Sequence, residues 1–207
     1  MLTEKLKAQF GTNVPIFTDE IIAIFPEYTR AYVFRLIRQA EQAGDLCCFS
    51  RGIYFIPKKT FFGISTICPE TVVEKKYLKS NGSIYGIYAG LNLLNRFGLT
   101  NQVPNIPEIV TNRESTRKRT ITIEGRQFIL RKSRCKITAE NYPAYTLLQL
   151  FHDMADSDLP NDFFKKQIAD FAAMNKVTIE DLIAMSVCFP PVALKKMIRS
   201  NVIHGTV

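Results

Sequence analysis

The sequence lacks the features of a membrane-spanning or secreted protein. Its longest apolar runs fall far short of the ~20 residues that a helix needs to cross a bilayer. The first five residues, Met1 to Lys5, include one acidic and one basic side chain but no apolar core of the kind found in signal peptides. We therefore expect a cytoplasmic protein with no membrane partner.

Residues that commonly hold metals are also scarce. There is no C-x-x-C pair, and a zinc site would need paired ligands at short spacing. The adjacent Cys47 and Cys48 would point to opposite faces of a strand. We expect reduced, mostly buried thiols and no metal or other cofactor. The residues concerned are Cys47, Cys48, Cys68, Cys135, Cys188, His152 and His204.

No arrangement of residues suggests catalysis. Both histidines lie in the last third of the sequence, where no serine and acid complete a triad, and no acidic–acidic–lysine strand of the nuclease type is clear. The segment "HDMADSD", residues 152–158, collects a histidine and three carboxylates, with Asp153 and Asp156 on one helix face. A helix end followed by a solvated acidic turn explains this segment more simply than a metal site. We expect no enzymatic activity.

The composition is that of a globular protein, but the positive charge is concentrated in the middle. Apolar residues make up 46% and charged residues 22% of the 207 residues, enough for one large domain or two small ones. Residues 1–59 carry 8 Lys/Arg and 6 Asp/Glu (+2), residues 60–140 carry 13 and 6 (+7), and residues 141–207 carry 6 and 7 (−1). This pattern suggests a polyanionic partner, nucleic acid first, although solubility alone could use the charge.

The first sixty residues predict three short helices. An apolar repeat over residues 2–10 predicts the first. Thr18 is expected to cap a second helix over residues 19–25, and Thr29 a third over residues 30–43. In the third, Val33, Leu36, Ile37 and Ala40 form an apolar stripe, and the opposite face carries Ala31, Arg35, Arg38 and Gln42, with Gln39 beside it. That face could contact phosphates and base edges, or could simply be solvated.

A hairpin is expected next, with strands over residues 45–49 and 52–56; "FSRGIYFIPKK", residues 49–59, contains its turn and its second strand. Its buried face is either Ile53 with Phe55 or Tyr54 with Ile56. Three helices followed by a hairpin are typical of the winged helix-turn-helix, with the third helix as reader and the hairpin as wing. We expect contacts with double-stranded DNA from Thr29, Arg30, Tyr32, Arg35, Arg38, Gln39, Arg51 and Lys58.

A second unit follows the wing. Residues 71–78 are expected to be helical, and "IYGIYAGLNLLNRFGLTNQVPNIPEIVT", residues 84–111, to contain a helix from about Gly86 to a stop at Gly98. Gly82, Gly86 and Gly90 recur every four residues. This spacing favours close packing of that helix over a phosphate-binding loop.

The wing ending in "RGIYFIPK", the glycine-containing helix, "GLTNQVP" and a strand ending in threonine resemble the AbiEi family of antitoxins, over roughly residues 15–135. The matching positions are Arg51, Gly52, Tyr54, Pro57, Gly86, Ala89, Leu91, Gly98, Leu99, Thr100, Gln102, Pro104 and Thr111. The resemblance implies an antitoxin of a bacterial abortive-infection (type IV) toxin–antitoxin system. Its winged helix would repress the pair's own promoter, and the remainder would counteract a nucleotidyltransferase-type toxin, directly or indirectly.

The segment "TNRESTRKRTITIEGRQFILRKSRCK", residues 111–136, predicts a basic hairpin. Its strands are expected over residues 120–123 and 127–130, around a turn at Glu124–Gly125. Nine of its 26 residues are Lys or Arg. They could protect strand edges, or form a patch for an acidic toxin surface or for RNA held by the toxin. As candidate partner surface we assign Arg113, Arg117, Lys118, Arg119, Arg131, Lys132 and Arg134.

The remaining residues predict helices over 145–154, from a cap at Asn161 to Met174, after a capping box at Thr178, and from Pro190–Pro191. The expected fold class is α+β: a winged helix-turn-helix in residues 1–59, a basic α+β antitoxin domain in 60–140, and a helical C-terminal subdomain in 141–207. The expected function is antitoxin and autorepressor. The alternative is a winged-helix transcription regulator whose second domain senses a ligand or a protein.

Overall fold

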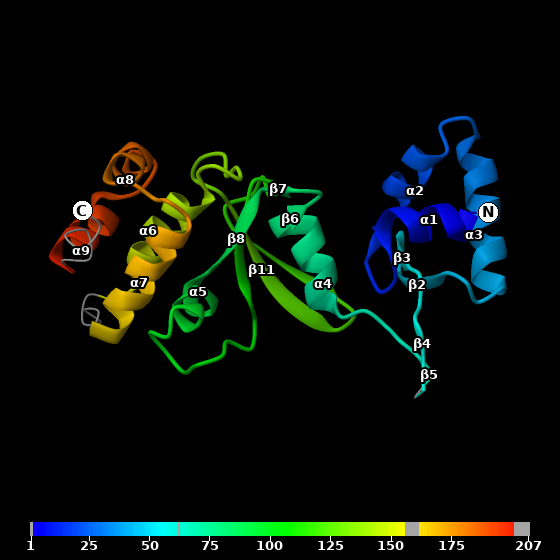
Figure 1. Ribbon diagram of the computed structural model, residues 1–207, viewed down its shortest axis with the longest axis horizontal. Helices are drawn as coiled ribbons and strands as arrows, with labels where there is room; N and C mark the ends of the chain where they lie inside the picture. The colour runs from blue at the N-terminus through cyan, green and yellow to red at the C-terminus, as the bar shows by residue number, and fades with distance from the viewer. Residues whose placement is uncertain (1, 62, 156–161, 201–207) are drawn as a thin grey trace. The chain divides into compact units, whose positions relative to one another are not determined.

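The computed structural model describes residues 2–61, 63–155 and 162–200, and it shows a mixed α+β chain (Figure 1). The chain divides into two compact units, Met1–Lys75 and Lys76–Val207. The division falls within a π-helical turn, Glu74–Leu78, whereas the sequence suggested domain ends at residues 59 and 140.

The first unit combines short helices with a small antiparallel sheet. Strand β3 is central in this sheet, with β1 on one side and β2 on the other, and Ile16 lies opposite Tyr54. The elements are α1 (Leu2–Phe10), β1 (Ile16–Phe17), α2 (Thr18–Ile24), α3 (Arg30–Gln42), β2 (Cys47–Ser50), β3 (Ile53–Phe55), β4 (Lys59–Thr60), β5 (Gly63–Ile64) and α4 (Pro69–Val73).

The core of this unit follows from the apolar stripes of its helices. Leu6 of α1, Phe25 after α2, and Val33 and Ile37 of α3 are buried together with Tyr54 from the hairpin. Tyr54 and Ile56, one of the two alternatives left open by the sequence, lie in this core, but β3 is buried at every position, so the expectation of a single buried face was wrong. Ile53 and Phe55 are also buried but are not part of that cluster.

The start of α2 differs from the prediction. The helix begins at Thr18 itself, with Phe17 at the N-cap position. The carboxylate of Glu20 accepts a hydrogen bond from the Phe17 N–H at 2.8 Å, which satisfies one N-terminal donor. The Thr18 hydroxyl instead donates to the Gly52 carbonyl at 3.2 Å. The predicted capping threonine therefore fastens the helix to the hairpin turn. At α3, by contrast, Thr29 accepts from the Tyr32 N–H as predicted.

The second unit is built on a mixed sheet of strand order β10-β11-β9-β8, in which β9 and β11 run parallel. Helix α6 packs on β8 and on α5, α7, α8 and α9, and it is buried from Pro143 to Phe151. The elements are β6 (Lys79–Ser80), β7 (Ser83–Ile84), β8 (Gly86–Ala89), α5 (Gly90–Arg96), β9 (Glu108–Thr111), β10 (Arg119–Ile123), β11 (Arg126–Lys132), α6 (Tyr142–Asp153), α7 (Asp162–Met174), α8 (Ile179–Ser186) and α9 (Pro191–Arg199).

The glycine-rich segment is not one helix, so that prediction was wrong. Gly86 lies in strand β8, and the helix begins only at Gly90. A Cβ atom at Gly86 would lie 2.1 Å from the Tyr77 carbonyl oxygen and 2.9 Å from that of Val110. Gly86 is therefore required by the close approach of two neighbouring backbones, and Gly82 by a turn with φ +76°.

The stop at Gly98 is confirmed. Gly98 has φ +72°, its N–H donates to the Asn95 carbonyl at 2.9 Å, and the Leu99 N–H donates to the Leu94 carbonyl at 2.9 Å. These two bonds form a Schellman motif.

The basic hairpin is also confirmed, because β10 and β11 pair antiparallel around Glu124 and Gly125, both with positive φ. The helices after Thr178 and Pro190 are present, whereas the expected cap at Asn161 lies outside the described residues.

Candidate nucleic-acid interface and basic patch

Helix α3 presents a polar, largely basic face. Arg30, Arg35, Arg38 and Gln39 are all exposed, whereas Val33, Ile37 and Ala40 are buried against the rest of the unit. The structure therefore brings the predicted contact residues of this helix onto the surface of one element. Tyr32 is half-buried, and Thr29 is exposed at the N-cap.

Arg35 has a specific orienting contact. Its guanidinium carbon lies 4.6 Å from the centroid of the Tyr32 ring, and Tyr32 in turn packs at 4.7 Å on Tyr28. A guanidinium over an aromatic face is attracted by the ring quadrupole and keeps its hydrogen-bond donors free at the edge. Arg35 is thus held in place while its donors remain available.

The three other predicted cations of this unit, Arg30, Arg51 and Lys58, are also exposed. Arg30 approaches Asp19 at 3.8 Å, but both side chains are largely exposed, so the pair contributes little and leaves Arg30 accessible. Arg51 is exposed in the turn between β2 and β3, and Lys58 is exposed beyond β3. Both are cations on the hairpin side of the unit.

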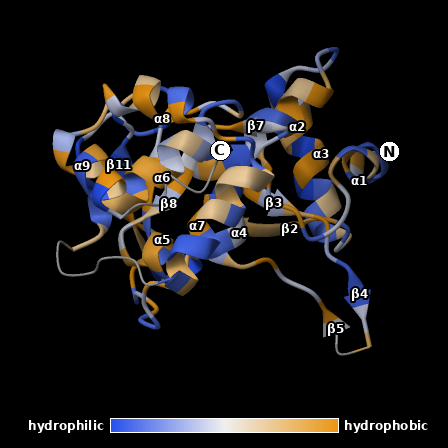
Figure 2. Cartoon of the chain, turned by 60° about the vertical axis from the view of Figure 1, so that its left-hand side comes forward, coloured by the Kyte–Doolittle hydropathy of each residue, from blue (hydrophilic) through white to orange (hydrophobic). Residues whose placement is uncertain are grey.

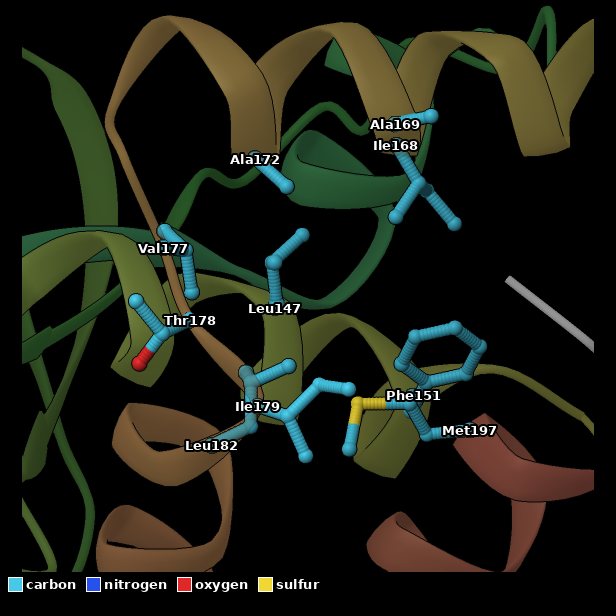
Figure 3. A pocket seen from close by; sticks show the side chains of 10 residues that line it. All are labelled: Leu147, Phe151, Ile168, Ala169, Ala172, Val177, Thr178, Ile179, Leu182 and Met197. Atoms are coloured by element: carbon cyan, nitrogen blue, oxygen red, sulfur yellow. The ribbon is translucent and has the colours of Figure 1, made fainter. Parts of the chain in front are cut away.

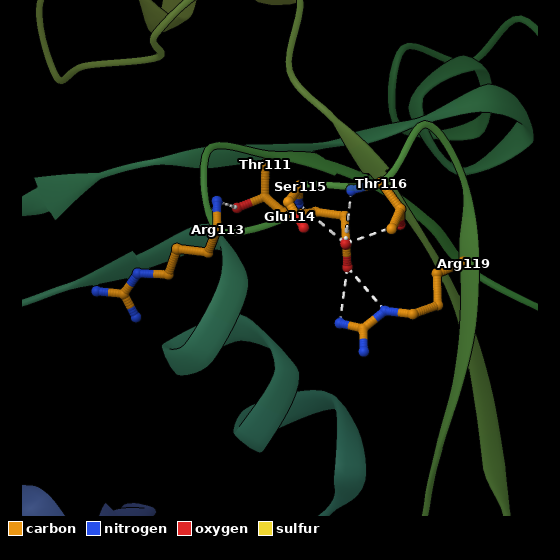
Figure 4. Close-up of polar contacts among 6 residues, drawn as sticks. All are labelled: Thr111, Arg113, Glu114, Ser115, Thr116 and Arg119. Atoms are coloured by element: carbon orange, nitrogen blue, oxygen red, sulfur yellow. Dashed lines mark hydrogen bonds and ion pairs between the residues drawn. The ribbon is translucent and has the colours of Figure 1, made fainter.

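In the second unit, some cations of the basic segment contact carboxylates or aromatic rings of the same unit, and others do not. Arg119 binds a carboxylate: its Nε and Nη2 donate to one oxygen of Glu114 at 2.9 and 2.7 Å (Figure 4). The other Glu114 oxygen accepts from the N–H groups of Ser115 and Thr116, at 3.0 Å each, and from the Thr116 hydroxyl at 2.8 Å. Glu114 is buried, at 5% exposure.

These contacts determine the ionisation of Glu114. Burial on its own would raise the pKa of this carboxyl group. The hydrogen bonds from Thr116 and the guanidinium of Arg119 outweigh burial and lower the pKa to about 2. Glu114 was not among the residues predicted from the sequence. The one feature that could have pointed to it is that it is a single acidic residue within a run of cations.

Three further cations of the segment have internal partners. Arg131 pairs with Glu108 at 2.5 Å, which neutralises a carboxylate oxygen that otherwise makes no hydrogen bond. Arg113 stacks on Tyr85, with its guanidinium carbon 3.6 Å from the ring centroid, and donates to the Lys76 carbonyl at 2.8 Å. Arg134 lies over the ring of Phe189 at 5.5 Å and within 2.9 Å of His152.

Of the seven residues assigned as candidate partner surface, Arg117, Lys118 and Lys132 remain, and we refer to these three as the basic patch. All three are exposed, and none forms an ion pair with the residues that the structure describes. The Lys132 N–H donates to the Thr116 carbonyl at 3.3 Å, which brings Lys132 next to the loop that carries the other two. The candidate partner surface is therefore narrower than the seven residues assigned from the sequence.

The acidic segment 152–158 begins at the end of α6, and its first carboxylate has a structural role. One oxygen of Asp153 accepts from the Gly90 N–H at 2.7 Å, and the other from Gln149 at 2.8 Å and His152 at 3.1 Å. Burial would raise the pKa of Asp153, but these contacts lower it. Within the described ranges no group of three His, Cys, Asp or Glu could hold a metal ion. Asp156 and Asp158 lie outside those ranges.

The cysteines differ from the prediction of mostly buried thiols. All five are free, but Cys48 and Cys68 are exposed and the other three are half-buried. The short strand β2 lies at the edge of its sheet and none of its residues is fully buried, so Cys47 and Cys48 do not reach the core.

A small cavity lies among the helices of the second unit. Its walls are the apolar side chains of α6, α7, α8 and α9, including Leu147, Phe151, Ile168 and Met197 (Figure 3). It holds about 20 Å³, room for a single water molecule, whereas pockets for small ligands measure about 300–1,000 Å³. This cavity does not fit a small-molecule effector.

The described helices include none with the length and apolar character to cross a membrane. A scan against protein-family models finds no match for the chain, and a search of curated proteins finds none either. The likeness to AbiEi antitoxins therefore depends on the quoted residues alone.

Proposed function

We propose that this chain is a DNA-binding antitoxin that represses its own promoter and counteracts a nucleotidyltransferase-type toxin. The DNA-binding half is carried by α3, whose basic face is exposed opposite a buried apolar stripe. Helices α1, α2 and α3 with the β2–β3 hairpin, and the pairing of β1 with β3, have the element order of a winged helix-turn-helix.

In this proposal α3 enters the major groove. Arg35, oriented by Tyr32, donates to base edges, with Arg38 and Gln39 beside it. Arg30 contacts a phosphate, and Arg51 in the hairpin turn reaches the flanking backbone. Phosphate contacts set register and affinity, whereas contacts to base edges give sequence preference.

The DNA-binding half is tested by comparing two duplexes of equal length, the DNA upstream of the chain's own reading frame and a shuffled version of it. Arg35→Ala is expected to lose about 1–3 kcal/mol of preference for the first duplex. The matched control is Lys166→Ala, an exposed cation on α7 in the other unit, which should bind as wild type does. Equal losses on both duplexes would make Arg35 a phosphate contact, and no loss on either would remove it from the interface.

The antitoxin half rests on the resemblance and on the basic patch. An acidic surface of the toxin, or RNA held by it, is the partner that three uncompensated cations fit best. The test is co-expression with a nucleotidyltransferase encoded next to this chain. Replacing Arg117, Lys118 and Lys132 with serine should abolish growth rescue while leaving promoter binding intact, and Arg35→Ala should do the reverse. Loss of both properties in both variants would contradict this separation of roles.

A further inference from the structure

The hairpin formed by β4 and β5 carries a nearly fully exposed aromatic side chain. Phe61, in its turn, is 98% exposed, and Ile64 is 65% exposed. The hairpin extends away from the helices and sheet of the first unit, and β5 has the colour of hydrophobic residues, whereas β4 has that of hydrophilic ones (Figure 2). Two large apolar side chains exposed on a projecting element are a candidate contact surface. We refer to this element as the Phe61 hairpin.

The base of the Phe61 hairpin is fastened to the first unit. The Lys58 N–H donates to the Ser65 hydroxyl at 2.8 Å, and that hydroxyl donates to the Asn13 side-chain oxygen at 2.6 Å. The Ser65 N–H donates to the Lys58 carbonyl at 3.0 Å, and nearer the turn the Thr60 hydroxyl donates to the Gly63 carbonyl at 2.8 Å. These bonds join the base of the hairpin, at Lys58 and Ser65, to the unit that contains α3.

Its charge indicates the chemistry of its partner. Residues 46–69 contain three cations, Arg51, Lys58 and Lys59, and no Asp or Glu. Both lysines are exposed. They line one depression together with Lys7, Gly44 and the two carboxylates Glu4 and Asp45; Gly44 and Asp45 follow the C-terminal end of α3. Cations next to an exposed aromatic, at the end of a proposed reader helix, fit a nucleic acid better than an acidic protein, because the aromatic ring can also contact bases.

We propose that the Phe61 hairpin is a second DNA-contacting element, in which Lys58 and Lys59 bind phosphates and Phe61 enters the minor groove beside the bases read by α3. The three residue steps from Lys58 to Phe61 span about 10 Å at about 3.3 Å per residue. This reach matches a minor groove about 7.5 Å deep. The inference rests on the proposed DNA binding and extends it to base pairs outside the reach of α3.

The test uses the full chain and a duplex that covers the wild-type footprint upstream of its reading frame. 2-Aminopurine is placed at successive positions flanking the footprint centre. Phe61→Ser should lose about 5- to 100-fold in affinity, and the 2-aminopurine signal should no longer change on binding. Replacing Lys58 and Lys59 with serine should lower the slope of log K against log salt by about 2, since each phosphate contact contributes about 0.9. Val103→Ser, at a 77% exposed apolar residue of the other unit, is the matched control.

The outcomes separate this inference from the proposed function. If Arg35→Ala impairs binding but Phe61→Ser retains wild-type affinity and 2-aminopurine response, the hairpin proposal is wrong and DNA binding stands. If wild type does not prefer the duplex, the proposed function itself fails. Loss of a wild-type dimer in sedimentation, or loss of co-purification with the toxin, with DNA binding unchanged, would assign the hairpin to a protein contact instead. Because the Phe61 side chain is 98% exposed, the far-UV circular dichroism spectrum and the melting temperature of Phe61→Ser should match those of wild type.

Discussion

Glu114→Gln tests whether the loop before β10 is held by an ionised carboxylate. The substitution keeps the size of the side chain but removes the charge that accepts from Thr116 and Arg119. The pKa of Glu114 falls from 4.5 to about 2 in the folded chain. At about 1.36 kcal/mol per pKa unit this would correspond to about 3 kcal/mol. Because half of the Arg119 side chain is exposed, solvent screening reduces the expected effect to about 1–2 kcal/mol.

The sign of the pH dependence follows from the lowered pKa. A carboxyl group that ionises more readily when folded stabilises the fold above its unfolded pKa, and this contribution is lost as the pH falls from about 4.5 to about 2. Glu114→Gln should therefore be less stable than wild type at pH 7, and the difference should shrink steadily below pH 4.5.

The assay is urea denaturation of both proteins over a pH series. The sequence contains no tryptophan, so unfolding is followed by far-UV circular dichroism and by amide hydrogen exchange in β10 and β11. Glu140→Gln, at an exposed glutamate before α6, should show no such pH-dependent difference. A stability difference between Glu114→Gln and wild type that stays constant from pH 7 to pH 3 would refute the reasoning.

Two further substitutions probe the backbone. Gly86→Ala should destabilise the second unit by more than about 3 kcal/mol, since its Cβ would lie 2.1 Å from a backbone oxygen that cannot move like a side chain; a melting temperature equal to that of wild type would contradict this. Thr178→Ala removes the acceptor of the Asp181 N–H at 3.1 Å and should cost about 1 kcal/mol in chemical denaturation. Thr178→Ser retains the acceptor and should restore most of that loss.

Much of the local structure could be read from the sequence because it depends on local rules. The stop at Gly98, the turn at Glu124–Gly125 and the capping box at Thr178 each need only a few neighbouring residues. The failures have long-range causes. Gly86 belongs to a strand because Tyr77 and Val110, distant in sequence, approach its backbone. No periodicity within residues 84–98 contains that information.

The candidate sites show the same limit. The polar face of α3 follows from helical spacing alone, so its exposed residues could be named in advance. Which cations of the basic segment form ion pairs could not be predicted from the sequence, because this depends on which carboxylates the fold places near them. Glu114 is five residues from Arg119, but Glu108 reaches Arg131 only through the parallel pairing of β9 and β11. The Phe61 hairpin was missed because strands of two residues leave no alternation to detect.

The division of the cations bears directly on how a partner would be recognised. Arg119 and Arg131 each pair with a carboxylate. Removing either arginine would leave a buried or half-buried negative charge without its ion-pair partner, which destabilises the fold. Replacing Arg117, Lys118 or Lys132 should not destabilise the fold in this way, because these residues are exposed and form no ion pair with the described residues. Glu114 orders the loop that carries Arg117 and Lys118. Substitutions in the basic patch should therefore change partner binding without changing stability, whereas a substitution at Glu114 should change both.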